Sequence, residues 1–397
     1  MSVKHAVLIL IITIALIVSA GCTQPAAPAA QPEAQPAMIA GGESPPPAQV
    51  SADLQRVCEN AIQGTGIPGM QIEVATPRWT WNSAAGNASP LTGEPARPGM
   101  RFFIASVSKT FTSVAVQKLA EEGKLSLDDP IDRWLPAGLI SRIPNGHSIT
   151  VRQLLGHTSG IADYDEDAIT LAEYRDPDLA VPYQTGLEQG LEASPLYPPG
   201  TNYTYSNVNY ILLTLIVDEA AGVPYEVYAT RTIFVPAGMN DTFFQHTSHI
   251  PGPHMRATMP GENGTIMDYT DLYILFDRGA GDIVSTTADL NRFHRALRGG
   301  RLISKTSLAG MEKPTPQSGP AGYGLGYTTA FVAPANLTLQ GHSGGYPGSF
   351  TLWSYLPEKD AYVTINLNSI GNSLDNIKNV RNAVLVYVNN GTVTGRT

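Results

Sequence analysis

Ser106 and Lys109 stand three positions apart at the start of a predicted helix, in the stretch Ile104–Phe111. Residues i and i+3 share one face of a helix, so the lysine amine can reach the serine hydroxyl. A serine needs a neighbouring base to act as a nucleophile, and a helix N-terminus favours the anion that acyl transfer develops. Of all the serines in the chain, only Ser106 has a lysine at the third following position. The pattern indicates nucleophilic catalysis, although a serine at this place can also simply cap a helix.

Tyr205 and Asn207 lie two positions apart at the entry of a helix that we predict over residues 208–221. A tyrosine phenol can act as a general base or acid if cationic neighbours lower its pKa. The Asn207 amide can hold Lys109 and bind a substrate carbonyl. The alternative is a turn rich in tyrosine and asparagine that only caps the helix.

A third group, His342, Ser343, Gly344 and Gly345, lies at the end of a predicted strand. Small residues at such a place let a substrate backbone lie against the sheet edge. The N–H of Gly345 can pair with that of Ser106 as an oxyanion hole, and His342 can carry a proton or a positive charge near a substrate carboxylate. The alternative is a glycine-rich hairpin with a histidine that faces solvent.

Two other clusters contain residue types that bind metals. Three histidines lie close in sequence: His246, His249 and His254. Four acids do the same: Asp163, Asp165, Glu166 and Asp167. The histidine spacing matches no common zinc signature, and the acids lack the glycine and terminal glutamate of an EF-hand loop. We therefore predict exposed loops at both places, with no metal and no cofactor.

His157 stands two positions before Ser159, which suggests a serine–histidine pair. No glycine-flanked nucleophile elbow surrounds these residues. We predict a structural loop that ends a helix.

The N-terminus carries a targeting pattern. Lys4 and His5 precede an apolar run over residues 6–18, and Cys22 follows three small residues. The run has the length of a signal-peptide core, and residues 1–22 resemble a lipoprotein signal in which Cys22 is lipidated. The alternative is an uncleaved anchor helix. Both predict a domain in the cell envelope that faces away from the cytoplasm and is attached to the membrane.

Residues 23–50 are rich in Pro, Ala and Gln and almost free of large apolar side chains. Such a segment cannot bury enough surface to fold, so we predict a disordered tether. The rest of the chain is long enough for one large domain. Its single cysteine, Cys58, leaves no partner for an internal disulfide. The net charge of −9 and the lack of a Lys/Arg run exclude nucleic acid as an expected partner.

Periodicity predicts an α+β domain. The expected strands span residues 70–75, 79–84, 324–329, 337–340, 348–355 and 361–366. The clearest expected helices span residues 52–63, 106–122, 208–221 and 374–388. This order gives an antiparallel sheet flanked by terminal helices, with a mostly helical lobe inserted at about residues 110–270.

Taken together, Ser-x-x-Lys, Tyr-x-Asn and His-Ser-Gly, in this order and widely spaced, resemble the motifs of the serine penicillin-recognising enzymes. The resemblance is closest to class C β-lactamases and to the serine D-Ala-D-Ala carboxypeptidase and esterase relatives. Three further stretches that look like structural signatures of this family are residues 123–130, 149–160 and 281–290. The resemblance covers about residues 52–388 and implies one β-lactamase-like hydrolase domain over residues 51–390.

The resemblance also implies a role for each motif residue. Ser106 would be the acylated nucleophile, and Lys109 would take its proton. Tyr205 would pass a proton to the leaving group and later activate water. Asn207 would hold Lys109 and the substrate amide, while the N–H groups of Ser106 and Gly345 would bind the oxyanion.

The third motif departs from the Lys-Thr-Gly of class C β-lactamases, because His342 replaces the lysine. His-Ser-Gly and Tyr-Ser-Asn both resemble the carboxypeptidase variant. We therefore expect a serine hydrolase of small amides or esters, such as D-amino-acid peptides, with weak β-lactamase activity. The alternative is a penicillin- or peptide-binding sensor without turnover. The presence of both Lys109 and Tyr205 favours the enzyme.

Overall fold

The computed structural model describes residues 44–369 and 374–390. The predicted signal segment, Cys22 and most of the predicted tether lie outside the described residues. The first helix, α1 (Ala48–Ile62), begins four residues before its predicted start. Val50 is buried in the core, so the last three residues of the predicted tether belong to this helix instead.

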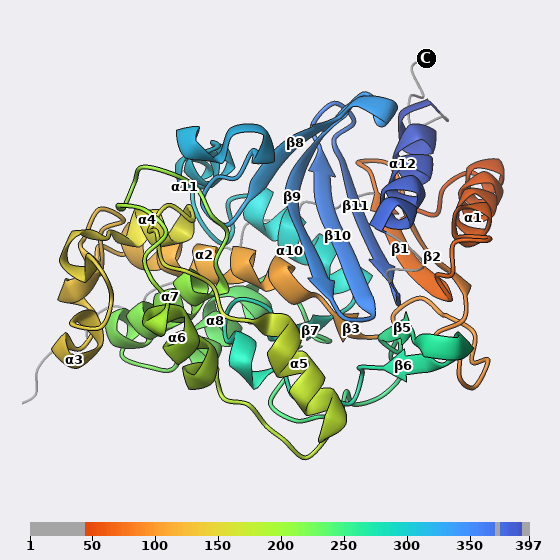
Figure 1. Cartoon of the computed structure of the whole chain (residues 1–397). Helices are drawn as coiled ribbons and strands as arrows, with labels where there is room; N and C mark the ends of the chain where they lie inside the picture. The colour runs from red at the N-terminus through yellow and green to blue at the C-terminus, as the bar shows by residue number, and fades with distance from the viewer. Residues whose placement is uncertain (1–43, 370–373, 391–397) are drawn as a thin grey trace, which may run out of the picture. The chain divides into compact units, whose positions relative to one another are not determined.

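Six antiparallel strands form the main sheet in the order β2-β1-β11-β10-β9-β8 (Figure 1). Their bounds are β1 (Gly69–Ala75), β2 (Thr80–Gly86), β8 (Thr328–Val332), β9 (Leu337–Tyr346), β10 (Ser349–Leu356) and β11 (Ala361–Leu367). Strands from the two ends of the domain meet at the β1–β11 pair. The predicted α+β class and the antiparallel sheet are confirmed.

Helices cover both faces of this sheet (Figure 1). Successive strand residues point to opposite faces. In β10, Leu352 joins the core beneath α1 and α12 (Leu374–Asn390), whereas Trp353 joins the core on the side of α10 (Thr287–Arg298). The Trp353 Nε1 donates to the carbonyl of Leu290 in α10 (2.8 Å). The sequence predicts the terminal helices but not α10, because residues 281–290 resemble a family signature without showing a clear helical pattern.

The inserted helical lobe is also confirmed. Its helices are α2 (Ser108–Glu121), α3 (Ala137–Ile140), α4 (Val151–Leu155), α5 (Glu166–Arg175), α6 (Tyr183–Glu192), α7 (Asn207–Ala221), α8 (Tyr225–Ala229) and α9 (Val235–Ala237). Helix α2 packs against α7, and both are buried along most of their length. Polar side chains that point from α2 into the lobe are therefore shielded from water.

Shorter elements complete the domain. A three-stranded sheet joins β3 (Phe102–Phe103), β7 (Ile283–Ser285) and β4 (Phe243–Phe244), and β5 (Thr258–Pro260) pairs with β6 (Ile266–Asp268). Helix α11 (Lys305–Glu312) precedes β8. Within residues 44–369 and 374–390, no helix combines the length and the apolar character needed to cross a membrane.

Two strand predictions need correction. Residues 324–327 are not a strand, because the N–H of Gly324 donates to the carbonyl of Tyr327 (2.7 Å) and closes a turn before β8. Strand β9 continues through Tyr346, so the motif that begins at His342 lies within the strand rather than beyond its end. Cross-strand pairing of His342 with Trp353 and of Gly345 with Phe350 holds this segment extended.

Candidate active site

Ser106 lies in a single 3₁₀ turn (Ala105–Val107) between β3 and α2. Ala105 has a φ of +46°, a left-handed conformation that non-glycine residues rarely adopt. The pairing of Phe103 with Val284 fixes the strand that leads into this turn. Local strain of this kind persists where the surrounding structure imposes it, often at functional sites. The turn presents a half-buried Ser106 at the start of α2.

Lys109 is fully buried one turn further along α2. Its Nζ lies 3.2 Å from Ser106 Oγ and donates to the carbonyl of Ala280 (2.9 Å). Burial lowers the pKa of Lys109, since the charged ammonium loses its hydration, while Asp277 and Glu166 oppose the shift. A lysine with a lowered pKa can accept a proton from the serine with which it makes contact.

Several acidic side chains surround Lys109. Burial raises the pKa of Glu166 to about 8 and that of Asp277 to about 6. The Tyr164 hydroxyl donates to Asp277 Oδ1 (2.6 Å). The predicted solvated acidic loop is therefore wrong for Asp163 and Glu166, because both carboxylates interact with buried Lys109. Asp165 instead caps α5 by accepting from the N–H of Ala168.

Tyr205 precedes α7, and its phenol lies near enough to the Ser106 side chain for Ser106 to influence its pKa. Lys109 Nζ lies 4.9 Å from the centre of the Tyr205 ring. Burial raises the pKa of Tyr205 far above its usual value, with Ser106 acting in the other direction. The expectation that cations lower this pKa is therefore wrong. Tyr205 can transfer protons as a neutral hydroxyl but is not a phenolate at neutral pH.

Asn207 is buried at the first position of α7. Its N–H donates to Asp163 Oδ1 (2.8 Å), so a carboxylate from another segment caps this helix. Its side-chain nitrogen donates to Glu166 Oε2 (3.3 Å). The structure thus places Asn207 beside the acids around Lys109, whereas the amine of Lys109 bonds to Ser106 and Ala280.

Strand β9 packs directly against the Ser106 turn. A methyl group added at Gly344 would come within 2.1 Å of the carbonyl oxygen of Ile104 and 2.9 Å of the Ser106 nitrogen. Only glycine permits this approach. Ser343 and Gly345 are exposed on the same strand, and nothing lies within 4 Å of a methyl group built at Gly345. The predicted oxyanion donors, Ser106 and Gly345, therefore belong to adjoining segments.

His342 differs from its predicted state. It is buried, its Nε2 is 3.1 Å from the Tyr323 hydroxyl, and its Nδ1 is 2.6 Å from the carbonyl of Ser343. Burial, with the positive charge of Lys109 as a second cause, lowers the pKa of His342 to about 4. The prediction of a histidine that carries charge near neutral pH is wrong. Its alternative, a solvent-facing histidine, is wrong as well.

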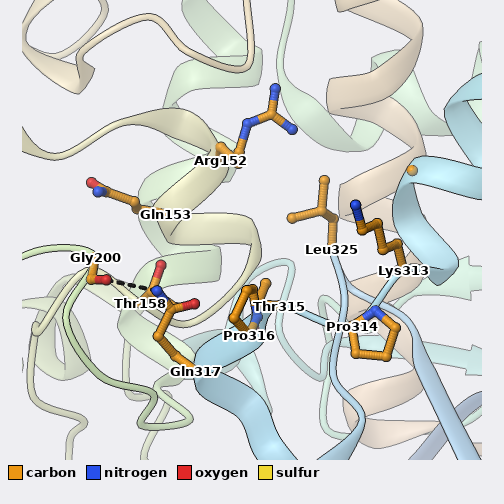
Figure 2. A pocket seen from close by; sticks show the side chains of 11 residues that line it. Arg152, Gln153, Thr158, Gly200, Lys313, Pro314, Thr315, Pro316, Gln317 and Leu325 are labelled. Atoms are coloured by element: carbon orange, nitrogen blue, oxygen red, sulfur yellow. Dashed lines mark hydrogen bonds between the residues drawn. The ribbon is translucent and has the colours of Figure 1, made fainter.

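The residues that line one surface cavity lie beside this site. A cavity of about 370 Å³ is lined by α4 residues and by the segment around residues 310–317 (Figure 2). Gln317 Nε2 donates to the carbonyl of Gly200 (2.8 Å), whose own N–H donates to the carbonyl of Thr158 (2.7 Å). Ser106, Lys109 and Tyr205 are not in its lining. The contacts hold the loop that leads to Tyr205.

Sequence reasoning overlooked several residues of the site. Asp277 lies more than 160 positions from Lys109 in sequence and belongs to no motif, so no sequence pattern indicated it. Tyr323 falls in a stretch that was predicted to lead into a strand. His157 was assigned to a structural loop, yet it lies against Tyr205 (ring centres 4.3 Å apart). Among the described residues, no group of three His, Cys, Asp or Glu side chains is arranged to hold a metal ion.

The profile of the Beta-lactamase family matches residues 54–387, so the chain belongs to this family. PbpX of Bacillus subtilis (strain 168) is 31% identical over 300 residues, which cover 75% of this chain and 70% of that protein. Penicillin-binding protein 4* of the same organism is 30% identical over 68% of this chain. The match spans 61% of that relative's length.

Solved structures give the same result. A D-stereospecific amidohydrolase from Streptomyces sp. superposes with a TM-score of 0.73 at 27% identity, covering 87% of this chain and 99% of that one. The D-amino acid amidase from Ochrobactrum anthropi SV3, complexed with L-phenylalanine amide, has a TM-score of 0.75 at 25% identity and covers 85% and 98%. The described domain is a serine hydrolase of the beta-lactamase and penicillin-binding protein family.

Proposed function

We propose that this chain is an exported, membrane-tethered serine hydrolase that acts through a covalent acyl-enzyme on small amides or esters. The observation that carries the proposal is the 3.2 Å contact between Ser106 Oγ and the Nζ of fully buried Lys109. A neutral amine at this distance can take the hydroxyl proton as the oxygen attacks a carbonyl carbon.

In the proposed reaction, Ser106 Oγ bonds to the carbonyl carbon and its proton passes to Lys109. The N–H groups of Ser106 and Gly345 bind the oxyanion. Tyr205, beside Ser106, passes a proton to the leaving amine or alcohol as its bond to carbon breaks, and takes the proton that Lys109 holds in return. The acyl-enzyme then reacts with water, which gives a proton to Lys109 through Tyr205. Lys109 returns this proton to Ser106 Oγ as the bond between Oγ and the acyl carbon breaks. The acid product and free Ser106 result.

Electrostatics favour substrates without a carboxylate near the scissile bond. The titratable groups that act on Lys109 are all acids: Asp277, Glu166, Asp163 and Asp282. His342, at the position of the lysine in class C β-lactamases, is neutral above a pKa of about 4. We therefore propose amides and esters of D-amino acids as the preferred class, with β-lactams as weak substrates. The solved relatives named for D-stereospecific amide hydrolysis support this choice.

Activity profiling of the purified domain tests this proposal. The panel comprises a D-amino acid amide, its L-enantiomer, a p-nitrophenyl ester, a D-Ala-D-Ala peptide, a chromogenic β-lactam and a fluorescent penicillin, with Ser106→Ala as the control. Turnover of the D-amide or ester that Ser106→Ala abolishes supports the enzyme. Stoichiometric acylation by penicillin without turnover of any substrate supports the sensor instead.

The membrane tether rests on the sequence of the first 50 residues. The apolar run over residues 6–18, Cys22 and the Pro/Ala-rich segment behind it support a lipid anchor. The test is fractionation of cells that express the full chain or Cys22→Ala, with intact-mass analysis of the N-terminus. Release of the variant from the membrane supports lipidation, whereas unchanged membrane association supports an uncleaved helix.

A further inference from the structure

His157 is fully buried next to Tyr205. It forms hydrogen bonds with the residues that precede and follow Tyr205. The N–H of Thr204 donates to the His157 carbonyl (3.1 Å), and the N–H of Ser206 donates to His157 Nδ1 (3.2 Å). His157 has a φ of +55°, a left-handed conformation that non-glycine residues rarely adopt. One residue in this conformation therefore binds the neighbours that precede and follow Tyr205.

The imidazole ring is fixed as firmly as the backbone. Asn209 Nδ2 lies 3.3 Å from His157 Nδ1, and the Ser159 hydroxyl orients Asn209 by donating to its Oδ1 (2.7 Å). Because Nδ1 accepts from the Ser206 N–H, the proton of a neutral ring must be on Nε2. That nitrogen is buried without a hydrogen-bond partner among the described residues. Such an unpaired group is costly and calls for an explanation.

Tyrosine rings enclose the imidazole. The ring centre of His157 lies 4.3 Å from that of Tyr205 at an interplanar angle of 32°. Tyr323 and Tyr210 follow at 4.8 Å and 5.1 Å, and Tyr203 lies at 6.1 Å. Burial holds the pKa of His157 well below its usual value, and nearby Lys109 lowers it further. The His157 imidazole is therefore neutral, and the Tyr205 ring packs against it.

We propose that His157 is a positioning residue for Tyr205, holding its backbone by two hydrogen bonds and its ring by packing so that the phenol stays beside Ser106. The inference rests on the proposed function, in which Tyr205 protonates the leaving group. His157 makes no contact with the reacting atoms in this scheme, and its whole effect on the reaction passes through Tyr205.

Two substitutions separate the contacts. Asparagine tolerates a positive φ, and its side-chain oxygen can replace Nδ1 as acceptor, so His157→Asn keeps the bonds and loses the ring. His157→Phe keeps a ring and loses the acceptor. Tyr203→Phe is the matched control, because it alters a more distant tyrosine of the same cluster. Thermal unfolding and the final extent of fluorophosphonate labelling give the folded, active fraction of each variant.

The informative measurement is how strongly the loss of activity depends on the leaving group of the substrate. Protonation by a positioned group contributes about 10²-fold or more, and nitrophenolate needs no such proton. We expect His157→Phe to lower kcat on a D-amino acid amide by about 10²-fold and His157→Asn by about 10-fold, with KM little changed. The burst of nitrophenolate from the p-nitrophenyl ester reports acylation alone, before the hydrolysis step in which Tyr205 also acts. This burst rate should fall less than about threefold, and Tyr203→Phe should match the wild type. Equal losses on amide and ester per active site would overturn the proposal.

A double-mutant cycle with Tyr205→Phe completes the test. If His157 acts through Tyr205, His157→Asn has no further effect in the Tyr205→Phe protein, and multiplicative losses overturn the inference. The cycle is run on both amide turnover and the rate at which a fluorescent penicillin labels Ser106, because the ring nitrogen of the penicillin needs a proton as it leaves. A wild-type protein that is labelled but turns nothing over contradicts the proposed function alone, and the labelling cycle then decides the role of His157. A wild-type protein that is not labelled overturns both.

Discussion

The site has two sides that differ in chemical character. The lobe side, formed by the Ser106 turn, α2 and the segments beside them, carries buried titratable groups such as Lys109, Glu166 and Asp277, and their pKa values are shifted from the usual range. The strand side is the end of β9. It offers a neutral His342, two glycines and backbone groups held by pairing with β10.

This difference suggests separate roles for the two sides in proton transfer and in substrate positioning. Proton transfer requires groups whose pKa values are tuned by burial, and these are on the lobe side. The strand side presents no charged group at His342, and we propose that it positions the substrate through shape and backbone donors. Substitutions on the lobe side should therefore lower kcat, whereas those on the strand side should change geometry and substrate preference. The predictions below test that division.

The largest effect is expected for Ser106→Ala, which removes the attacking oxygen. Covalent labelling by a fluorophosphonate or penicillin probe should disappear while the far-ultraviolet circular dichroism spectrum stays unchanged. Intact-mass analysis checks the result. Labelling of the variant at another serine would show that Ser106, and hence the lobe side, does not supply the nucleophile.

Lys109→Arg should be nearly as damaging. The guanidinium stays protonated at all working pH values and cannot accept the serine proton. We expect kcat to fall by about 10²-fold or more, with a smaller change in KM. Steady-state kinetics on the amide and the ester measure both constants. Near-normal turnover would exclude Lys109 as the base.

On the strand side, Gly344→Ala should have an intermediate effect. The added methyl group would meet the Ile104 carbonyl at 2.1 Å, so β9 must shift away from the Ser106 turn. A displacement of about 1 Å can cost about 10²-fold in rate, and we expect a loss of 10- to 100-fold in kcat/KM. Thermal unfolding compares this variant with Gly345→Ala, whose added methyl group has nothing within 4 Å, so β9 should stay in place and stability should remain within about 0.5 kcal/mol of the wild type. Equal effects at both positions would refute the close-packing argument.

The sequence was informative where one motif coincides with one local element. The spacing of Ser106 and Lys109 predicts their contact because both lie on one short stretch of helical backbone. Alternating apolar residues predict most of the sheet. The strand prediction for residues 324–327 is wrong because a turn closed by Gly324 and Tyr327 overrides their apolar pattern.

Electrostatic states could not be predicted in the same way. The pKa of His342 depends on burial against Tyr323 and on the charge of Lys109, and both contacts join segments distant in sequence. A resemblance between motifs identifies which residues gather at a site. It does not give the desolvation that decides their charge. The acids around Lys109 were missed for the same reason, since Asp277 reaches it only through tertiary packing.

His342→Lys tests the neutral character of the strand side. In the wild type, a pKa of about 4 means that His342 is uncharged from pH 5.5 upward, so its charge adds nothing to the affinity for carboxylate-bearing substrates from pH 5.5 to 8. Lysine would add a cation, and a charge-assisted bond should lower KM for a β-lactam by about 10-fold. Uncharged esters should show no such gain. A KM for the β-lactam that His342→Lys leaves unchanged would show that this position does not meet the substrate carboxylate.

Asp282→Asn addresses the lobe side through stability and should have the smallest effect on the reaction. Asp282 is buried, and burial raises its pKa to about 8, whereas the unfolded chain releases the same proton near pH 4. Unfolding therefore releases a proton between these values, and the stability that the protonated Asp282 contributes is lost as pH rises from about 4 to about 8. Asparagine keeps the shape of the neutral acid and does not titrate. We expect the variant to match the wild type in thermal unfolding at pH 4.5 and to exceed it at pH 8 by about 1–3 kcal/mol. Calorimetry at both pH values measures the difference. A variant that is destabilised equally at both would show that the lobe side does not hold this acid neutral.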